Sequence, residues 1–212
     1  MALAYASLSP NISDRIQPLL PALKSNWLIA HVMTSFLGYA AFAIAFGVSI
    51  MFIFKQRAAG GNSGLLDRLP DAGVLDELTH QLVMFGFLFL TAGIITGAVW
   101  ANSAWGRYWG WDPKETWALV TILVYTFIGH MHKIPGFRGN FAISTAALLG
   151  ISSVLMTYFG VNYYLSGLHS YASGEPAPIP TGVYIAVIVV FIVIAGAFIS
   201  EKNMKPEPEK ES

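Results

Sequence analysis

The sequence predicts an all-α, polytopic membrane protein with about five transmembrane helices and a tryptophan-rich amphipathic segment at its outer face. Of its 212 residues, 55% are hydrophobic and only 11% are charged, whereas charged residues make up about 25% of a soluble domain. The mean hydropathy is +0.57. Apolar stretches recur along the chain, and several approach the length of about 20 helical residues that crosses a hydrocarbon layer.

The overall composition also excludes several kinds of site and partner. The formal net charge is zero, so no overall charge attracts nucleic acid, and none is expected as a partner. The chain has no cysteine, which excludes disulfides, thiolate metal sites, a CxxCH haem-attachment motif and a thiol relay within this chain. Methionine, histidine and carboxylate side chains remain as possible metal ligands.

Prolines, glycines and charges separate the apolar stretches into elements. Residues 1–26 contain three prolines and are predicted to form an outer surface segment. The predicted transmembrane domain covers residues 27–200, with spans at residues 27–54, 82–101, 116–131, 141–161 and 181–200. Residues 58–79 are predicted to form a loop, and residues 201–212 a charged cytoplasmic tail without fixed structure.

Residues 105–119, with the sequence WGRYWGWDPKETWAL, hold four of the six tryptophans. The second half of this segment is typical of a helix start. Asp112 suits the N-cap, Pro113 the first helical position, and Glu115 the third position of a capping box. Asp112 and Glu115 are also two nearby carboxylates, as in a general acid pair, but capping explains their spacing better.

Five spans place the two termini on opposite sides of the membrane, and the distribution of cations indicates which side is cytoplasmic. Eight lysines and arginines fall on one side and four on the other. The larger set is Lys55, Arg57, Arg68, Lys133, Arg138, Lys202, Lys205 and Lys210; the smaller is Arg15, Lys24, Arg107 and Lys114. We therefore expect the N-terminus, the tryptophan segment and the loop of residues 162–180 outside, and the C-terminus in the cytoplasm.

This topology sorts the histidines by depth. His31 and His169 fall at the depth of the tryptophan segment and form an outer pair. His130 lies 17 residues after Pro113, which at 1.5 Å per residue is about 25 Å deeper. With His80 it forms an inner pair.

Two imidazoles beside an aromatic surface would suit a bis-histidine haem site, because haem iron takes axial histidine nitrogens. A flat porphyrin stacks on indole rings, and Arg107 or Lys114 would meet its propionates. The indoles of this shelf would be Trp105, Trp109 and Trp111. Two simpler interpretations stay open: interfacial tryptophans often form only an aromatic belt, and a single histidine at a helix end is often merely solvated.

The same residues carry a family resemblance. WGRYWGWDPKETWAL resembles the WWD signature of haem-handling proteins, and its DPKETW ending resembles the CcsA/ResC branch of cytochrome c biogenesis, known as system II. The segments SNWLIAHVMTSFLGYA, LTAGIITGAVWA and YFGVNYYLSGLHSY agree with the same family. Members of that family usually begin with further transmembrane helices before the segment that begins this chain.

The resemblance implies a haem transport and presentation component of a holocytochrome c synthase (haem lyase) complex. It implies a ResB/CcsB-type membrane partner, haem b as the transported substrate, and thioether attachment of haem to the CxxCH cysteines of apocytochrome c. His31 and His169 would be the axial ligands of an outer site. His130 would belong to an inner site whose second ligand lies on the partner, and His80 would be a bystander. The membrane would be a bacterial inner membrane or a plastid thylakoid.

Three other functions remain as alternatives. A b-type electron-transfer subunit would hold haem permanently between helices, although His169 in a loop argues against it. A transporter or assembly scaffold would never bind haem. A system I haem-delivery protein would pass haem to a chaperone.

Overall fold

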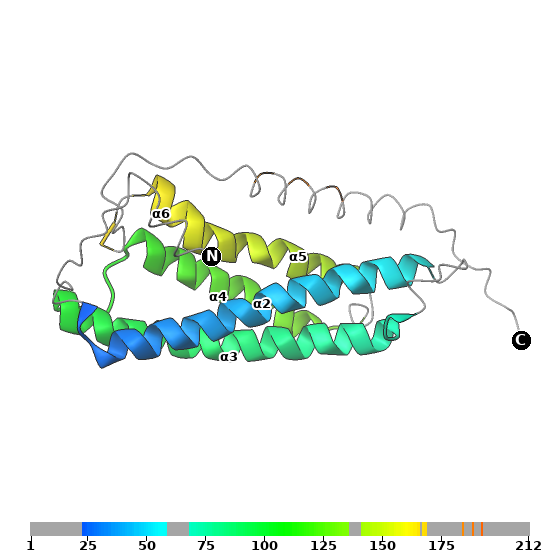
Figure 1. The fold of residues 1–212 in the computed structure, drawn as a ribbon, viewed down its shortest axis with the longest axis horizontal. Coiled ribbons are helices and arrows are strands. Elements are labelled where there is room, and N and C mark those ends of the chain that lie inside the picture. Colours follow the sequence, from blue (N-terminus) through cyan, green and yellow to red (C-terminus); the bar gives the residue numbers. More distant parts are fainter. Residues whose placement is uncertain are drawn as a thin grey trace, which may run out of the picture.

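The chain folds into a bundle of long helices (Figure 1). The computed structural model describes residues 23–58, 68–135, 141–165, 167 and 168, together with the single residues 184, 188 and 192. The helices are α2 (Asn26–Ala58), α3 (Ala72–Trp105), α4 (Pro113–Met131) and α5 (Phe141–Leu155), which continues through the π-helical turn η3 (Met156–Gly160) into α6 (Val161–Tyr164). Every regular element among these described residues is a helix, which confirms the all-α prediction.

The helices alternate in direction, so each end of the bundle collects particular residues. α2 begins, α3 ends, α4 begins and α6 lies at one end, called the tryptophan end because Trp105 lies there (Figure 1). α2 and α3 approach closely in the middle, where an added Cβ on Gly38 would lie 3.1 Å from the carbonyl oxygen of Gly86. Contact through small residues is typical of helix pairs in membranes. The ring of Tyr125 in α4 stacks on Phe42 of α2, with 3.5 Å between ring centroids.

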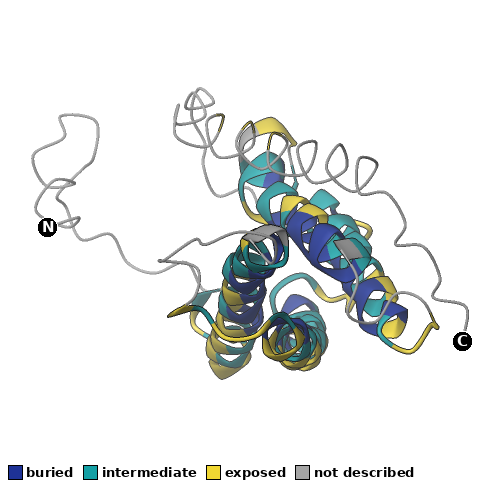
Figure 2. Cartoon of the chain, turned by 90° about the vertical axis from the view of Figure 1, so that its right-hand side faces the viewer, coloured by how far each residue is buried: buried dark blue, intermediate teal, exposed yellow. Residues whose placement is uncertain are grey.

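Apolar side chains cover the outside of the bundle as well as its centre. Figure 2 shows exposed residues along the outer faces of helices whose inner faces are buried. Exposed examples include Phe36, Ile44, Leu88, Ile95, Leu123 and Phe127. Within the described residues, three helices are long and apolar enough to cross a membrane: Asn26–Gln56, Ala72–Trp105 and Ala142–Gly160. These features agree with the predicted membrane protein.

The predicted number of five spans is tested only in part. α4 is a helix of 19 residues, as predicted, but it is not among the three apolar enough to cross, since Lys114, Glu115 and His130 make it more polar. The predicted fifth span, residues 181–200, lies outside the described residues apart from 184, 188 and 192. The proposed outer segment and charged tail also lie almost wholly outside them, so those assignments stay predictions.

One predicted boundary is wrong. Residues 72–79 were expected in a loop because of their acidic residues, but α3 begins at Ala72. Asp76 is buried at 4% exposure, and its Oδ2 lies 3.4 Å from Nε2 of His132 at the end of α4. Glu77 accepts a hydrogen bond from Gln81 one turn later, at 3.2 Å. Asp76 thus has a partner at the end of α4, and Glu77 has one within α3, so both acids are accommodated in a helix.

The contact between Asp76 and His132 leads to a stability prediction. Asp76 supplies the carboxylate nearest to the buried side chain of His132, so replacing Asp76 with alanine should lower the free energy of unfolding by about 1–3 kcal/mol. Glu77→Ala is the matched control: Glu77 is half-exposed and lies 4.0 Å from the same nitrogen, so its loss should change stability by less than about 0.5 kcal/mol. Thermal unfolding in detergent measures both, and equal shifts would contradict this role for Asp76.

Candidate functional site

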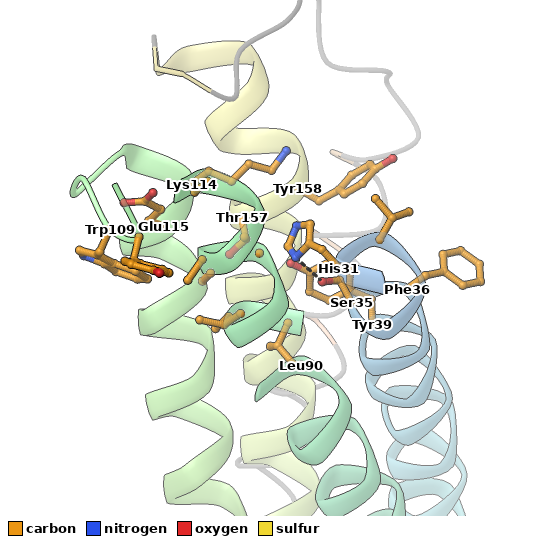
Figure 3. Close-up of a pocket in the computed structure, with 17 residues that line it drawn as sticks. His31, Ser35, Phe36, Tyr39, Leu90, Trp109, Lys114, Glu115, Thr157 and Tyr158 are labelled. Carbon is orange, nitrogen blue, oxygen red and sulfur yellow. Dashed lines mark hydrogen bonds between the residues drawn. The ribbon is translucent and has the colours of Figure 1, made fainter. Parts of the chain in front are cut away.

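A cavity lies at the tryptophan end of the bundle, between α2, α3, the start of α4 and η3 (Figure 3). It encloses about 270 Å³. Its walls are mainly apolar and aromatic, as is usual for pockets that bind organic ligands. The polar and aromatic groups that line it are His31, Ser35, Phe36, Tyr39, Tyr108, Trp109, Lys114, Glu115, Thr157 and Tyr158.

His31 has a defined orientation in this cavity. Its Nδ1 lies 2.7 Å from the carbonyl oxygen of Gly93 in α3 and 3.5 Å from the hydroxyl of Ser35. Because a carbonyl oxygen only accepts hydrogen bonds, Nδ1 carries the proton and the lone pair of the neutral ring is on Nε2. Metal-binding histidines are commonly oriented by such a bond from the other ring nitrogen to a backbone carbonyl. His31 is therefore held in the tautomer that a ligand through Nε2 requires.

Gly97 of α3 makes room for this imidazole, and Trp100 of the same helix lies beside it. A Cβ on Gly97 would lie 2.6 Å from Nδ1 of His31, so no larger residue fits there without moving the ring. Gly93 and Gly97 are four residues apart and share one face of the helix. The buried ring of Trp100 lies nearly parallel to that of His31, at 6.3 Å between centroids and 10° between planes. The sequence signal for this surface is the GIITG spacing, which the prediction of the site did not use.

The tryptophan segment is divided between support and cavity wall. Trp105 is the last residue of α3 and packs edge-on against Trp100, with centroids 4.8 Å apart. Gly106, with φ of 74°, then ends the helix in the left-handed region that favours glycine. Of residues 107–112, which connect α3 to α4, Tyr108 and Trp109 line the cavity. Trp105, predicted as part of the haem shelf, thus packs against Trp100 and is not among the residues that line the cavity.

Trp111 occupies an unusual position in the turn before α4. Its φ is 55°, a conformation that costs a non-glycine residue about 1–3 kcal/mol. Its side chain is 69% exposed and its ring stands at 89° to that of Trp109, 5.7 Å away. The turn thus places the indole of Trp109 against the cavity, whereas the indole of Trp111 lies outside it.

The two predicted cations differ in their surroundings. Arg107 is exposed, and its side chain lies against Gly110, where an added Cβ would come within 2.7 Å of Nε. Lys114 lines the cavity, and its Nζ donates to Oδ1 of Asn162 at 3.2 Å. Burial lowers the pKa of Lys114 below the usual range for lysine, and the neighbouring carboxylate of Asp112 opposes part of that shift. An anionic ligand group in the cavity would raise the pKa of Lys114 again and favour its charged ammonium form.

The predicted capping box is confirmed. Oδ2 of Asp112 accepts a hydrogen bond from the backbone N–H of Lys114 at 3.2 Å. Oε2 of Glu115 accepts from the N–H groups of Asp112, at 3.2 Å, and Gly110, at 2.7 Å. Both carboxylates hold the backbone of the turn, which supports capping over a general acid pair.

The π-helical turn η3 supplies the opposite wall. The hydroxyl of Thr157 lies 2.9 Å from that of Thr121 and 3.1 Å from the carbonyl oxygen of Trp117, joining this turn to α4. Figure 3 shows Thr157 and Tyr158 on the ribbon that faces His31 and Lys114. π-helical turns are frequent at functional sites. The sequence predicted one uninterrupted span here, because no proline marks the irregular turn.

Most of the chain matches a known protein family. Residues 1–169 match the family described as cytochrome C assembly protein. The chain belongs to this family.

Several proteins of known name are similar to this chain. It is 43% identical over 169 residues to the cytochrome c biogenesis protein CcsA of Chlamydomonas reinhardtii, covering 79% of this chain and 47% of that protein. It is 41% identical over 180 residues to protein NrfI of Wolinella succinogenes, covering 79% and 18%. With CcsA of Parasynechococcus marenigrum the identity is 37% over 195 residues, covering 80% and 63%. The chain therefore spans less than two thirds of each of these relatives.

The remaining histidines of this cytochrome C assembly protein lie in different surroundings. His130 is exposed near the opposite end of the bundle, and its Nδ1 donates to the carbonyl of Thr126 at 2.7 Å. His80, which topology grouped with His130, instead stacks on His132, with 4.1 Å between ring centroids. His132 was missed as a possible partner. His169 lies outside the described residues, although the preceding residue, Leu168, is described.

Proposed function

We propose that this chain binds haem b in the cavity at the tryptophan end and presents it at the outer face for attachment to apocytochrome c. It would act as one component of a cytochrome c synthase, together with a ResB/CcsB-type membrane protein. The orientation of His31 carries the proposal, because its Nδ1–H is bonded to Gly93 and its Nε2 has the lone pair. The names of the relatives, CcsA among them, support the role in cytochrome c biogenesis.

The cavity has the chemistry that a haem requires. Apolar and aromatic walls suit the porphyrin ring, His31 supplies an axial nitrogen, and Lys114 supplies a cation for a propionate. A volume of about 270 Å³ is slightly below the usual range of about 300–1,000 Å³ for ligand pockets. The cavity would therefore enclose only part of the ring and leave an edge open to a second protein. His169 is proposed as the second axial ligand.

The chain would act by holding its substrate in place. His31 would fix the iron, Trp109 would stack on the ring and Lys114 would orient a propionate, so that the vinyl groups stay accessible. The thiols of the apocytochrome CxxCH motif then add across the vinyl groups: sulfur bonds to one vinyl carbon and the thiol proton ends on the other. This addition needs no nucleophile from a chain that contains no cysteine.

The experiment is to purify the chain with its partner and measure copurifying haem by the pyridine haemochrome assay and by absorption. We expect b-type haem with a six-coordinate, low-spin spectrum that is lost when apocytochrome c takes the haem. Absence of haem would favour a transporter or scaffold. Haem that stays bound at fixed stoichiometry would favour an electron-transfer subunit. A haem chaperone in place of the ResB/CcsB-type partner would favour system I.

We also propose that His130 contributes to an inner haem site completed by the partner. Its side chain is exposed, and its Nδ1 bond to Thr126 leaves the lone pair on Nε2, the nitrogen that would bind iron. His130→Ala should lower copurifying haem to roughly half, because one of two ligated sites is lost. Phe127→Ala, at an exposed position one turn earlier, is the control and should leave the haem content unchanged. Unchanged haem in His130→Ala would remove the case for this site.

A further inference from the structure

We propose that Glu115 positions the tryptophans at the cavity, because its carboxylate holds Trp111 in the left-handed conformation and thereby keeps Trp109 in the cavity wall. Residues 109–112, which contain both tryptophans, are called the tryptophan turn. The inference rests on the proposed function, because Trp109 is proposed to stack on the haem. It assigns Glu115 a positioning role in addition to capping.

One oxygen of Glu115 accepts two backbone hydrogen bonds from the tryptophan turn. Oε2 accepts from the N–H of Asp112 at 3.2 Å, which completes the capping box. It also accepts from the N–H of Gly110 at 2.7 Å. This second bond is the shorter one, and it reaches a residue two positions before the N-cap, so a capping box does not require it. Glu115 therefore does more than begin α4.

Trp111 lies between the two donors and has the conformation that lets them converge. Its φ is 55°, and among the described residues no other non-glycine residue has a positive φ. Such a residue is strained, because its Cβ approaches the following carbonyl oxygen. However, backbone N–H groups can converge on one anion when the chain alternates between right-handed and left-handed residues. The two bonds to the carboxylate of Glu115 offset the strain, since hydrogen bonds to ionised groups are about twice as strong as neutral ones.

The conformation of Trp111 decides where the two indoles lie. Trp109 lines the cavity, whereas Trp111 is 69% exposed and its ring stands at 89° to that of Trp109. Glu115 and Trp109 lie on the same side of the cavity (Figure 3). His31 is oriented separately, by Gly93 of α3. Loss of the Glu115 carboxylate should then displace the aromatic wall and spare the axial ligand.

The first test is Glu115→Ala in the full chain without haem, followed by hydroxyl-radical footprinting and mass spectrometry. We expect Trp109 to lose its protection from oxidation, because the turn that holds it opens. Amide exchange at Gly110 should become faster by about tenfold or more, since the hydrogen bond to an ionised group is lost. Trp100 in α3 is only 2% exposed and should stay protected, which shows that the bundle is intact.

Three further variants serve as controls for this measurement. Glu115→Gln keeps an acceptor oxygen and suits the same capping position, so Trp109 should stay protected. Glu77→Ala removes a carboxylate that accepts a bond from Gln81 at the opposite end of the bundle, and it should not change Trp109. If Glu115→Ala does not accumulate, Glu115→Asp replaces it: its shorter side chain keeps a carboxylate in the first turn of α4 but should not reach Gly110.

The second test compares Trp111→Gly with Trp111→Ala. Both variants remove the indole, but only glycine adopts a positive φ without steric cost. While Glu115 holds the turn, the glycine variant should melt about 2–4 °C higher than the alanine variant. Combined with Glu115→Ala, the turn is free to leave the left-handed region, so this difference should disappear. The loss of the cap is the same for both Trp111 variants and does not affect their difference.

The third test uses the complex with the partner and haem. In Glu115→Ala the low-spin spectrum should persist, because His31 keeps its bond to Gly93. Haem affinity should fall by about two- to tenfold, as expected for the loss of one aromatic stacking contact. Unchanged protection of Trp109, together with an equal melting difference with and without Glu115, would overturn the inference. If the wild type binds no haem, the proposed function fails, and the first two tests alone decide whether Glu115 holds the turn.

Discussion

Replacing His31 with alanine is expected to abolish the six-coordinate, low-spin haem spectrum of the outer site and to lower holocytochrome c yield by about a hundredfold or more. Loss of a residue that only orients a metal ligand costs about 10–100-fold in affinity or activity, so loss of the ligand itself should cost at least as much. His31 is well placed for this role because its Nδ1–H is bonded to Gly93 and its ring lines the cavity.

The controls separate ligand loss from a damaged helix. Met33→Ala changes an exposed residue of the same helix and should leave spectrum and yield unchanged. His31→Gly keeps the space of the imidazole, so added imidazole should restore the low-spin spectrum. A normal spectrum and yield in His31→Ala would refute the assignment of His31 as a ligand. His169→Ala tests the second ligand in the same way and should lose the same spectral form.

The elements that depend on local sequence were predicted well. α2 begins and ends within a few residues of the predicted span, because an uncharged apolar stretch ends at Lys55 and Arg57. The capping box at Asp112 and Glu115 was also predicted, since its spacing alone determines its hydrogen bonds. The first turns of α3 were not predicted, because Asp76 is accommodated by His132, more than 50 residues later in the chain.

The candidate site could be located from the sequence but not described in detail. Topology alone brings His31, Trp109 and Lys114 to one end of the bundle, and the cavity there contains all three. The rotation of each helix about its axis decides which neighbours they meet, and a hydrophobic stretch without strong amphipathicity does not indicate that rotation. For this reason Trp100 and Tyr158 were missed. The hydrogen bond from the backbone N–H of Leu168 to Oδ1 of Asp112 joins residues 56 apart in the sequence, and no local pattern predicts it.

Replacing Gly97 with alanine is the strongest test of the interpretation that α3 shapes the haem ligand. The added Cβ would lie 2.6 Å from Nδ1 and 2.8 Å from Cε1 of His31, so the imidazole must move and its bond to Gly93 must lengthen or break. Because that bond orients the ligand, haem occupancy of the outer site should fall by about 10–100-fold. Alanine is also the better helix former, by about 1 kcal/mol, so α3 itself should not be weakened.

A loss of haem without a loss of stability would show that Gly97 acts by positioning His31 and that the substitution does not simply destabilise the protein. Gly47→Ala is the matched control, because among the described residues a Cβ added there would have no atom within 4 Å apart from its chain neighbours and its own helix backbone. It should keep both haem occupancy and thermal stability. Gly97→Ala should lose haem while its melting temperature without haem stays at or above that of the wild type. If both variants kept their haem, the imidazole of His31 would tolerate displacement, and orientation by α3 would not be needed for ligation.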